Sequence, residues 1–211
     1  MKIKTADFSN HILDKARVFA TVAHAGQRRK YTNENYVVHP IECVAILQSL
    51  PASSGITLDQ MIGMLLHDTI EDSRRYTDEH GNFITNPASH HHQGNSVYLV
   101  EVITLDMVEA EFGKEARRIT AGLTDVSMPW DGSRSKRKAI DLAHTAEQAN
   151  DVKTCKLADL LSNAPSIIEN DTGFAKTWMK EKAALVEVLK DGGDPILVAE
   201  VQSILDQFFK A

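Results

Sequence analysis

The sequence is poor in the features that mark secreted and membrane-spanning proteins. Among its 211 residues there are only two cysteines, Cys43 and Cys155, which lie far apart in apolar surroundings. Two such residues do not suggest a disulfide framework, and we expect buried free thiols, as in a reducing compartment. No segment approaches the ~20 apolar residues of a membrane-spanning helix, and the charged N-terminal stretch lacks the apolar run of a signal peptide. We therefore expect a cytoplasmic protein without a membrane anchor.

An excess of basic residues is also absent. With 23 Lys and Arg against 29 Asp and Glu, the formal net charge is −6, which argues against a general nucleic-acid binder. The positive charge is nevertheless concentrated in two clusters, at 27–30 and 134–138. Each cluster could be a solvated helix end or part of a pocket for a small polyanion, and composition leaves both interpretations open.

Length and patterning predict one all-α domain spanning residues 1–211. The composition, 43% hydrophobic and 25% charged, is that of an ordinary globular protein with a single core. Helical spacing of apolar residues along most of the chain predicts about eight to ten helices, one of them starting with a capping box at Thr57–Gln60. Residues 73–103, rich in Asn, His, Gly and Ser, are predicted to form a loop-rich insertion with a short hairpin near 78–84.

The stretch LLHDTIED, residues 65–72, places four polar groups at the end of an apolar run. If the run continued as one helix, His67 would lie above Glu71, and Asp68 above both Glu71 and Asp72, because side chains three and four apart share a face. Each such group costs roughly 1–3 kcal/mol when it is buried without a partner. A metal ion bound between them would compensate this cost.

Two further polar residues lie in apolar surroundings elsewhere in the chain. His39 stands at the start of a helix in YVVHPI, and Asp159 lies inside KLADLLSN, with Asn163 one turn further along. Taken alone, Asp159 is also open to interpretation as a capped or paired core residue. Together with His67 and Asp68, however, the two residues would complete a set of two imidazoles and two carboxylates, which suits Mn²⁺, Fe²⁺ or Zn²⁺.

Five motifs in this order resemble the hydrolase domain of the RelA/SpoT homologues. They are AHAGQRRK (23–30), YVVHP (36–40), LLHDTIED (65–72), EFGKEARRITAGLTDVS (111–127) and KLADLLSN (156–163). Within that family the chain is most similar to the single-domain small alarmone hydrolases, which belong to the HD phosphohydrolase superfamily. The resemblance implies an HD-domain helical bundle over nearly the whole chain.

The resemblance also implies roles for particular residues. The metal ligands of the family fall on His39, His67, Asp68 and Asp159, and its metal is usually Mn²⁺. The catalytic pair that handles water and protons falls on Glu71 and Asp72, and the contacts to base and ribose fall on Arg29, Lys30 and Asn163. To these we add Arg137 as a phosphate contact, because the basic cluster at 134–138 could stabilise the distal phosphates.

The implied activity is metal-dependent hydrolysis of the 3′-pyrophosphate of (p)ppGpp, the alarmone of the stringent response, to GDP or GTP and pyrophosphate. A divalent metal offsets phosphate charge and lowers the pKa of bound water from about 15.7 towards 7. We therefore expect a hydrolase without an opposing synthetase, with a small nucleotide as its partner and neither nucleic acid nor a membrane. Whether it forms a homo-oligomer is left open.

Two departures from the family pattern keep alternatives open. After Leu-Ala-Asp the family has a cation and a ring, whereas this chain has Leu160 and Ser162, so (p)ppApp or NADPH remains an alternative substrate. The insertion at 73–103 is longer than the family leads us to expect and could be a lid or a partner surface. A non-catalytic alarmone-binding module would use such a surface, although it would not need residues that activate water. The run 90–92, three histidines, is not expected to chelate one ion, because consecutive side chains cannot converge without strain.

Overall fold

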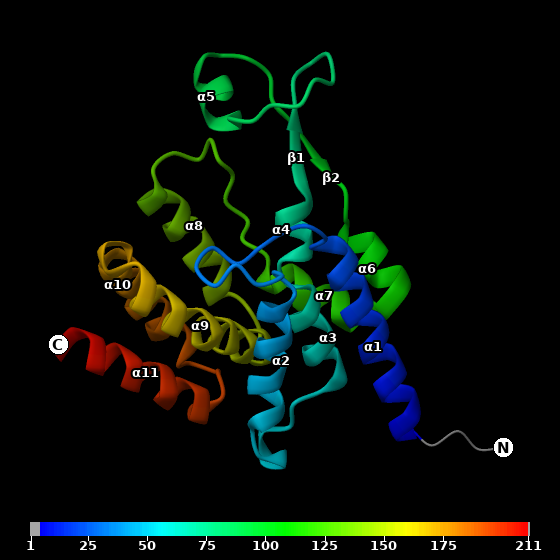
Figure 1. Cartoon of the computed structure of the whole chain (residues 1–211), viewed down its shortest axis with the longest axis vertical. Coiled ribbons are helices and arrows are strands. Elements are labelled where there is room, and N and C mark those ends of the chain that lie inside the picture. Colours follow the sequence, from blue (N-terminus) through cyan, green and yellow to red (C-terminus); the bar gives the residue numbers. More distant parts are fainter. Residues whose placement is uncertain (1–4, 211) are drawn as a thin grey trace.

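A computed structural model describes residues 5–210, with side chains from residue 10 onward, and Figure 1 shows how its helices are arranged. The helices are α1 (Thr5–Ala23), α2 (Val38–Ser49), α3 (Leu58–Leu66), α4 (Thr69–Ser73), α5 (Pro87–His92), α6 (Leu105–Phe112), α7 (Lys114–Leu123), α8 (Arg134–Ala146), α9 (Asn150–Asn170), α10 (Thr172–Leu189) and α11 (Pro195–Lys210). A 3-10 turn (Ala52–Ser54) and two strands, β1 (Arg74–Thr77) and β2 (Tyr98–Glu101), complete the described elements. The prediction of an all-α fold is confirmed.

Helices α3 and α9 form the centre of the bundle. Helix α3 packs against α1, α2 and α7, and α9 packs against α2, α7, α10 and α11. Apolar side chains on both central helices are fully buried, among them Met64 and Leu65 on α3 and Leu157 on α9. Helices α3 and α7 approach closely because Gly63 has no side chain: a Cβ there would lie 2.5 Å from Cγ2 of Ile119. The residues of the candidate site are thereby attached to the buried core of the bundle.

Helix α3 ends at Leu66 and α4 begins at Thr69, and His67 and Asp68 form a turn between them. The Nδ1 nitrogen of His67 lies 2.7 Å from the carbonyl oxygen of Met64. The Thr69 hydroxyl donates to the carbonyl oxygen of Leu66, also at 2.7 Å. These side chains satisfy carbonyl groups at the end of α3, where the helical hydrogen bonds stop. The prediction of one continuous helix through this stretch is therefore wrong, because local side-chain hydrogen bonds replace the helical ones.

Residues 74–101 form a structured excursion from the bundle. Strands β1 and β2 pair antiparallel over four residue pairs, and α5 lies between them in the sequence. Figure 1 shows the ribbon and α5 projecting together from one end of the bundle. Within the predicted hairpin region a turn does form, closed by a 2.8 Å hydrogen bond from the Ile84 amide to the Tyr76 carbonyl oxygen. Helices α4 and α5 bring the number in the described residues to eleven, above the eight to ten predicted.

The sequence predictions about thiols are confirmed, since Cys43 and Cys155 are both free and buried. Burial raises the pKa of both thiols above its usual range, which keeps them in the unreactive neutral form. Within residues 5–210, no helix has both the length and the apolar character that crossing a membrane would require.

Candidate active site

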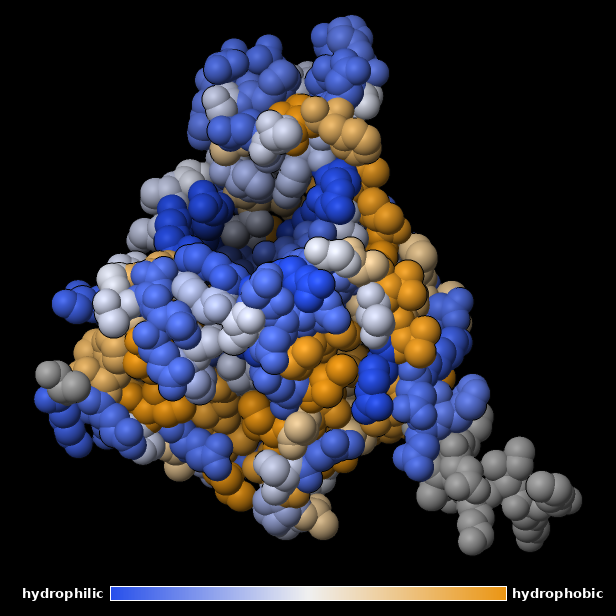
Figure 2. All heavy atoms as spheres, viewed as in Figure 1, coloured by the Kyte–Doolittle hydropathy of each residue, from blue (hydrophilic) through white to orange (hydrophobic). Residues whose placement is uncertain are grey.

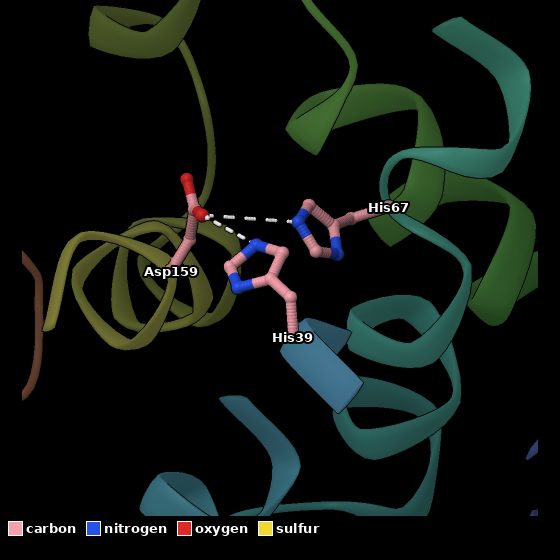
Figure 3. Close-up of side chains that lie close together, drawn as sticks. All are labelled: His39, His67 and Asp159. Carbon is pink, nitrogen blue, oxygen red and sulfur yellow. Dashed lines mark ion pairs between the residues drawn. The ribbon is translucent and has the colours of Figure 1, made fainter. Parts of the chain in front are cut away.

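Three places in the bundle bring two histidines and two carboxylates together. His39 lies in the first turn of α2 and Asp159 in the middle of α9. His67 and Asp68 lie at the break between α3 and α4. Figure 3 shows His39, His67 and Asp159 pointing towards one another. The Oδ1 atom of Asp159 lies 3.2 Å from Nε2 of His39 and 3.8 Å from Nε2 of His67. Asp68 completes the group, with its Oδ2 atom 2.9 Å from Nε2 of His67.

Both imidazoles turn their Nε2 atoms towards the carboxylates, because each Nδ1 atom has another partner. For His67 this partner is the Met64 carbonyl oxygen, and for His39 it is the hydroxyl oxygen of Ser162, at 3.0 Å. The Nε2 atom of His67 is buried and lies 2.9 Å from Oδ2 of Asp68. A buried imidazole nitrogen that faces two carboxylates fits a divalent metal ion, which would replace the proton on that nitrogen.

The charges of the group are strongly coupled. Burial disfavours a charged Asp68, but the neighbouring His67 outweighs this effect and lowers the pKa of Asp68 to about 2. Burial is likewise outweighed at Asp159, where the hydrogen bond with His39 and the charge of Lys156 hold the pKa well below its usual range. The carboxylates in turn raise the pKa of His67 to about 9 in spite of its burial. Two ionised carboxylates in this position favour a cation between the imidazoles.

Three connected cavities surround the ligands. The central cavity, about 730 Å³, is lined by Asp68, Glu71 and Asp159 together with residues of α8 and α10. A smaller aromatic pocket, about 320 Å³, shares Tyr36 and Asn163 with it. A ribbon-side cavity, about 460 Å³, lies beneath β1 and α5, and the residues that it shares with the central cavity are Glu71, Asp125, Arg134 and Lys138.

Glu71 and Asp72 lie one turn beyond Asp68, in different surroundings. Glu71 lines the central cavity. Although it remains accessible, the surrounding protein withdraws its carboxyl group from bulk water, and the Asp125 and Asp68 carboxylates repel further charge, which together raise its pKa to about 7. Asp72 turns away and accepts a 2.8 Å hydrogen bond from the side chain of Gln27. Glu71 is thus the member of the pair that can exchange a proton near neutral pH inside the cavity.

The three residues predicted to contact the base and ribose all line the aromatic pocket. Its lining includes Arg29, Lys30, Tyr31, Tyr36, Asn163 and Phe174. The Arg29 guanidinium is held by Glu42 at 2.6 Å, and the Lys30 ammonium lies 4.7 Å from the Tyr31 ring centre and 5.6 Å from that of Phe174. The pocket therefore combines flat apolar surfaces with positively charged donors beside the candidate metal ligands.

Arg137, predicted to contact phosphate, lies apart from these residues. It lines the ribbon-side cavity, where its Nη1 atom donates to the carbonyl oxygen of Gly132 at 2.6 Å. Arg134 and Lys138 line the same cavity. Three residues of the cluster at 134–138 thus line a cavity, whereas Lys136 is exposed, and a polyanion pocket stays a prediction.

The two departures that follow Leu-Ala-Asp lie outside both the aromatic pocket and the central cavity. Leu160 is fully buried in the core. The Ser162 hydroxyl lies behind His39 and donates to Oε2 of Glu42 at 2.9 Å. Neither residue lines the pocket directly, and the expectation that they alter nucleotide preference stays a prediction.

Two residues of the site were missed from the sequence. The Tyr36 hydroxyl donates to Oδ2 of Asp68 at 2.7 Å. The Lys156 ammonium lines the central cavity and lies 3.5 Å from Oδ1 of Asp125. Lys156 is three residues before Asp159 on α9, so helical spacing could have identified it. Tyr36 precedes α2, and nothing in the local spacing indicates its role.

Similar proteins support an assignment to a family. No protein-family model matches the chain. The guanosine-3′,5′-bis(diphosphate) 3′-pyrophosphohydrolase MESH1 of Mus musculus is 31% identical over 169 residues, which are 79% of this chain and 76% of that protein. The MESH1 protein of Homo sapiens is 30% identical over 151 residues, 71% of this chain and 65% of that protein.

Longer proteins match over only a small share of their own length. A GTP pyrophosphokinase of Myxococcus xanthus is 40% identical over 68 residues, which are 32% of this chain and only 8% of that protein. Among solved structures, a metazoan ortholog of SpoT that hydrolyses ppGpp matches with a TM-score of 0.70 over 98% of both chains, at 20% identity. That structural match establishes a shared fold.

Proposed function

Because the chain belongs to the family of small RelA/SpoT-type HD hydrolases that includes the MESH1 proteins, we propose that it removes the 3′-pyrophosphate of (p)ppGpp. The products would be pyrophosphate and GDP or GTP. The observation that carries the proposal is the convergence of His39, His67, Asp68 and Asp159 beside a cavity that also contains Glu71. In this proposal residues 1–211 act as one hydrolase domain. The proposed location is the cytoplasm, with which the buried free thiols of Cys43 and Cys155 are consistent.

The proposed metal ligands are His39, His67, Asp68 and Asp159, and Mn²⁺ is the proposed ion. Mixed imidazole and carboxylate donors suit a metal of intermediate hardness, and the buried Nε2 atom of His67, which faces Asp68 and Asp159, supports this assignment. When bound, such an ion would neutralise phosphate charge and acidify a water molecule. Tyr36 supports the set by donating to Asp68, which holds that carboxylate in place.

The aromatic pocket is the proposed site of the nucleoside. Tyr31 and Phe174 offer rings against which a base can lie, and Arg29 and Lys30 supply positive charge at its edge. Asn163 lines both this pocket and the central cavity, and its amide donates to Oδ1 of Asp159 at 2.8 Å. It therefore stands where the ribose would meet the scissile phosphate.

The proposed step is attack of water on the phosphorus that is bonded to the ribose 3′ oxygen. A new bond forms between the water oxygen and that phosphorus, and the bond from phosphorus to the 3′ oxygen breaks. Glu71 would accept the water proton. Asp72 would assist because its negative charge favours protonation of Glu71. The 3′ oxygen takes a proton and remains on the nucleoside, while pyrophosphate leaves.

The test is product analysis with Mn²⁺-loaded protein and three substrates, ppGpp, ppApp and NADPH. We expect pyrophosphate release from ppGpp, lost with EDTA and in Asp68→Ala. Turnover of ppApp or NADPH alone would move the proposal to another nucleotide. Binding of ppGpp without turnover of any substrate would replace it with a non-catalytic alarmone-binding module.

A further inference from the structure

The central cavity adjoins each of the other two cavities. The aromatic pocket and the ribbon-side cavity share no lining residue, whereas the central cavity shares residues with each of them. The candidate metal ligands therefore lie between two separate compartments. A substrate whose nucleoside occupies the aromatic pocket and whose scissile phosphorus lies at the ligands would extend its next phosphate towards the ribbon-side cavity.

The ribbon-side cavity contains two guanidinium groups without a close carboxylate partner. Arg137 makes only the hydrogen bond to a carbonyl oxygen and takes part in no ion pair within the described residues. Arg74 donates to the backbone oxygen of Asp125, its nearest carboxylate oxygen lies 3.8 Å away, on Glu101, and its buried Nε atom has no hydrogen-bond partner. A buried guanidinium nitrogen without an acceptor is costly, and an anion in the cavity would satisfy it.

The other two cations of the cavity are paired with carboxylates. Arg134 makes two 2.8 Å hydrogen bonds to Glu181, and Lys138 lies 2.6 Å from Oδ2 of Asp125. The lining also contains the carboxylates of Glu71 and Asp72, of which Asp72 accepts a hydrogen bond from Gln27. The cations free to meet an anion are therefore Arg74 and Arg137. Two forked guanidinium groups are well suited to the oxygens of a terminal phosphate.

The excursion forms the roof of this cavity. Ala88 of α5 and Tyr76 of β1 line it, and Tyr76 also contacts Trp130 in the loop before α8. The Trp130 ring is stacked on His91 at 5.6 Å and meets Tyr76 edge-on at 5.7 Å. Figure 2 shows a hollow below the excursion with hydrophilic residues on its rim. Through these aromatic contacts the excursion is connected to the loop before α8.

We propose that the ribbon-side cavity binds the terminal phosphate of the 3′-diphosphate and then the pyrophosphate product, with Arg74 and Arg137 as its anion ligands. This inference rests on the proposed function, because it takes the scissile bond to lie at the metal ligands. It gives the excursion a role, since that segment contributes Arg74 and the roof. Substrates with a diphosphate at the 3′ position are thereby distinguished from those with a single phosphate.

The test uses calorimetry of inorganic pyrophosphate and inorganic phosphate with Mn²⁺-loaded protein at a fixed concentration of free Mn²⁺. We expect Arg137→Ala and Arg74→Ala each to weaken pyrophosphate binding about tenfold or more, because each removes charged hydrogen bonds. Phosphate binding should change much less, since a single phosphate reaches only the metal ligands. Lys136→Ala is the matched control, because this exposed residue is on the same helix and lines neither cavity.

Unchanged pyrophosphate affinity in Arg137→Ala and Arg74→Ala would overturn the proposal, as would an equal loss in Lys136→Ala. Thermal unfolding of each variant separates lost binding from lost structure, and Arg137→Ala alone is sufficient if Arg74→Ala does not fold. The measurement does not depend on turnover. Pyrophosphate binding through the two arginines in a protein that leaves ppGpp intact would contradict the proposed function but not the anion site.

Discussion

The Nδ1 atom of His39 lies 3.0 Å from the hydroxyl oxygen of Ser162, which itself lies 2.9 Å from the carboxylate of Glu42. A hydroxyl can accept from the imidazole while it donates to the carboxylate, which fixes the tautomer whose Nε2 lone pair faces Asp159. Arg29 binds the same Glu42 oxygen at 2.6 Å. The orientation of a proposed metal ligand is thus connected to a residue of the aromatic pocket.

We predict that Ser162→Ala weakens Mn²⁺ binding by about tenfold to a hundredfold, because hydrogen-bond partners of metal ligands contribute this much to affinity. Competition with a chromophoric chelator would measure the dissociation constant. Ser203→Ala is the control, since that hydroxyl is on α11 and accepts only from the side chain of Gln207. Equal affinities of the two variants would mean that packing alone orients His39.

The candidate ligands could be proposed from the sequence more readily than the backbone that carries them. His39, Asp68 and Asp159 could be proposed because each is a polar residue in an apolar motif. The break at His67 could not be predicted, since it involves a hydrogen bond between the His67 side chain and the Met64 carbonyl group, which competes with the helical bonds. The role of Ser162 was missed for a related reason, because its partners lie more than a hundred residues away in the sequence. The excursion pairs strands separated by a weakly periodic segment, and such long-range pairing leaves little local signal.

The pH dependence of turnover should follow Glu71. Its pKa is raised to about 7, so the carboxyl group is increasingly protonated below that pH and cannot accept a proton from water. We predict that kcat/KM falls as pH decreases through this range. The Asp125→Asn variant removes a repelling charge and should lower the pKa of Glu71, so the acidic limb of the profile should move to lower pH.

The control for this shift is Asp14→Asn, an exposed side chain on α1 that pairs with Arg17. A bound cation lowers the pKa of Glu71 in all variants, so the difference between the profiles is the informative quantity. An acidic limb that stays in place in Asp125→Asn would mean that another group limits the reaction.

Metal binding should stabilise the folded protein. The four proposed ligands come together only in the folded chain, so Mn²⁺ at about a hundred times its dissociation constant should add about 2.7 kcal/mol to the free energy of unfolding. We predict a higher melting temperature with Mn²⁺, reversed by EDTA, and no such rise in Asp159→Ala. A Mn²⁺-dependent rise that persists in Asp159→Ala would place the ion elsewhere.

The close approach of α3 and α7 offers a test of the packing behind the site. In Gly63→Ala the new Cβ would lie 2.5 Å from Cγ2 of Ile119, so one helix must move. We predict a loss of about 1–3 kcal/mol in the free energy of unfolding, measured by denaturant titration. Gly173→Ala on α10 is the control, because its Cβ would meet nothing nearer than 4.0 Å. A Gly63→Ala variant as stable as this control would contradict the packing described.

The stack of His91 on Trp130 gives the excursion a measurable link to the proposed anion site. Such an aromatic contact contributes about 0.5–1.5 kcal/mol, so its loss in His91→Ala should weaken pyrophosphate binding by a factor of about two to ten. His90→Ala is the matched control, because its ring makes no aromatic contact within the described residues. If the two variants bind pyrophosphate equally well, the roof does not depend on this stack. Since neither histidine lines the cavity, any difference between them must act through the position of the excursion.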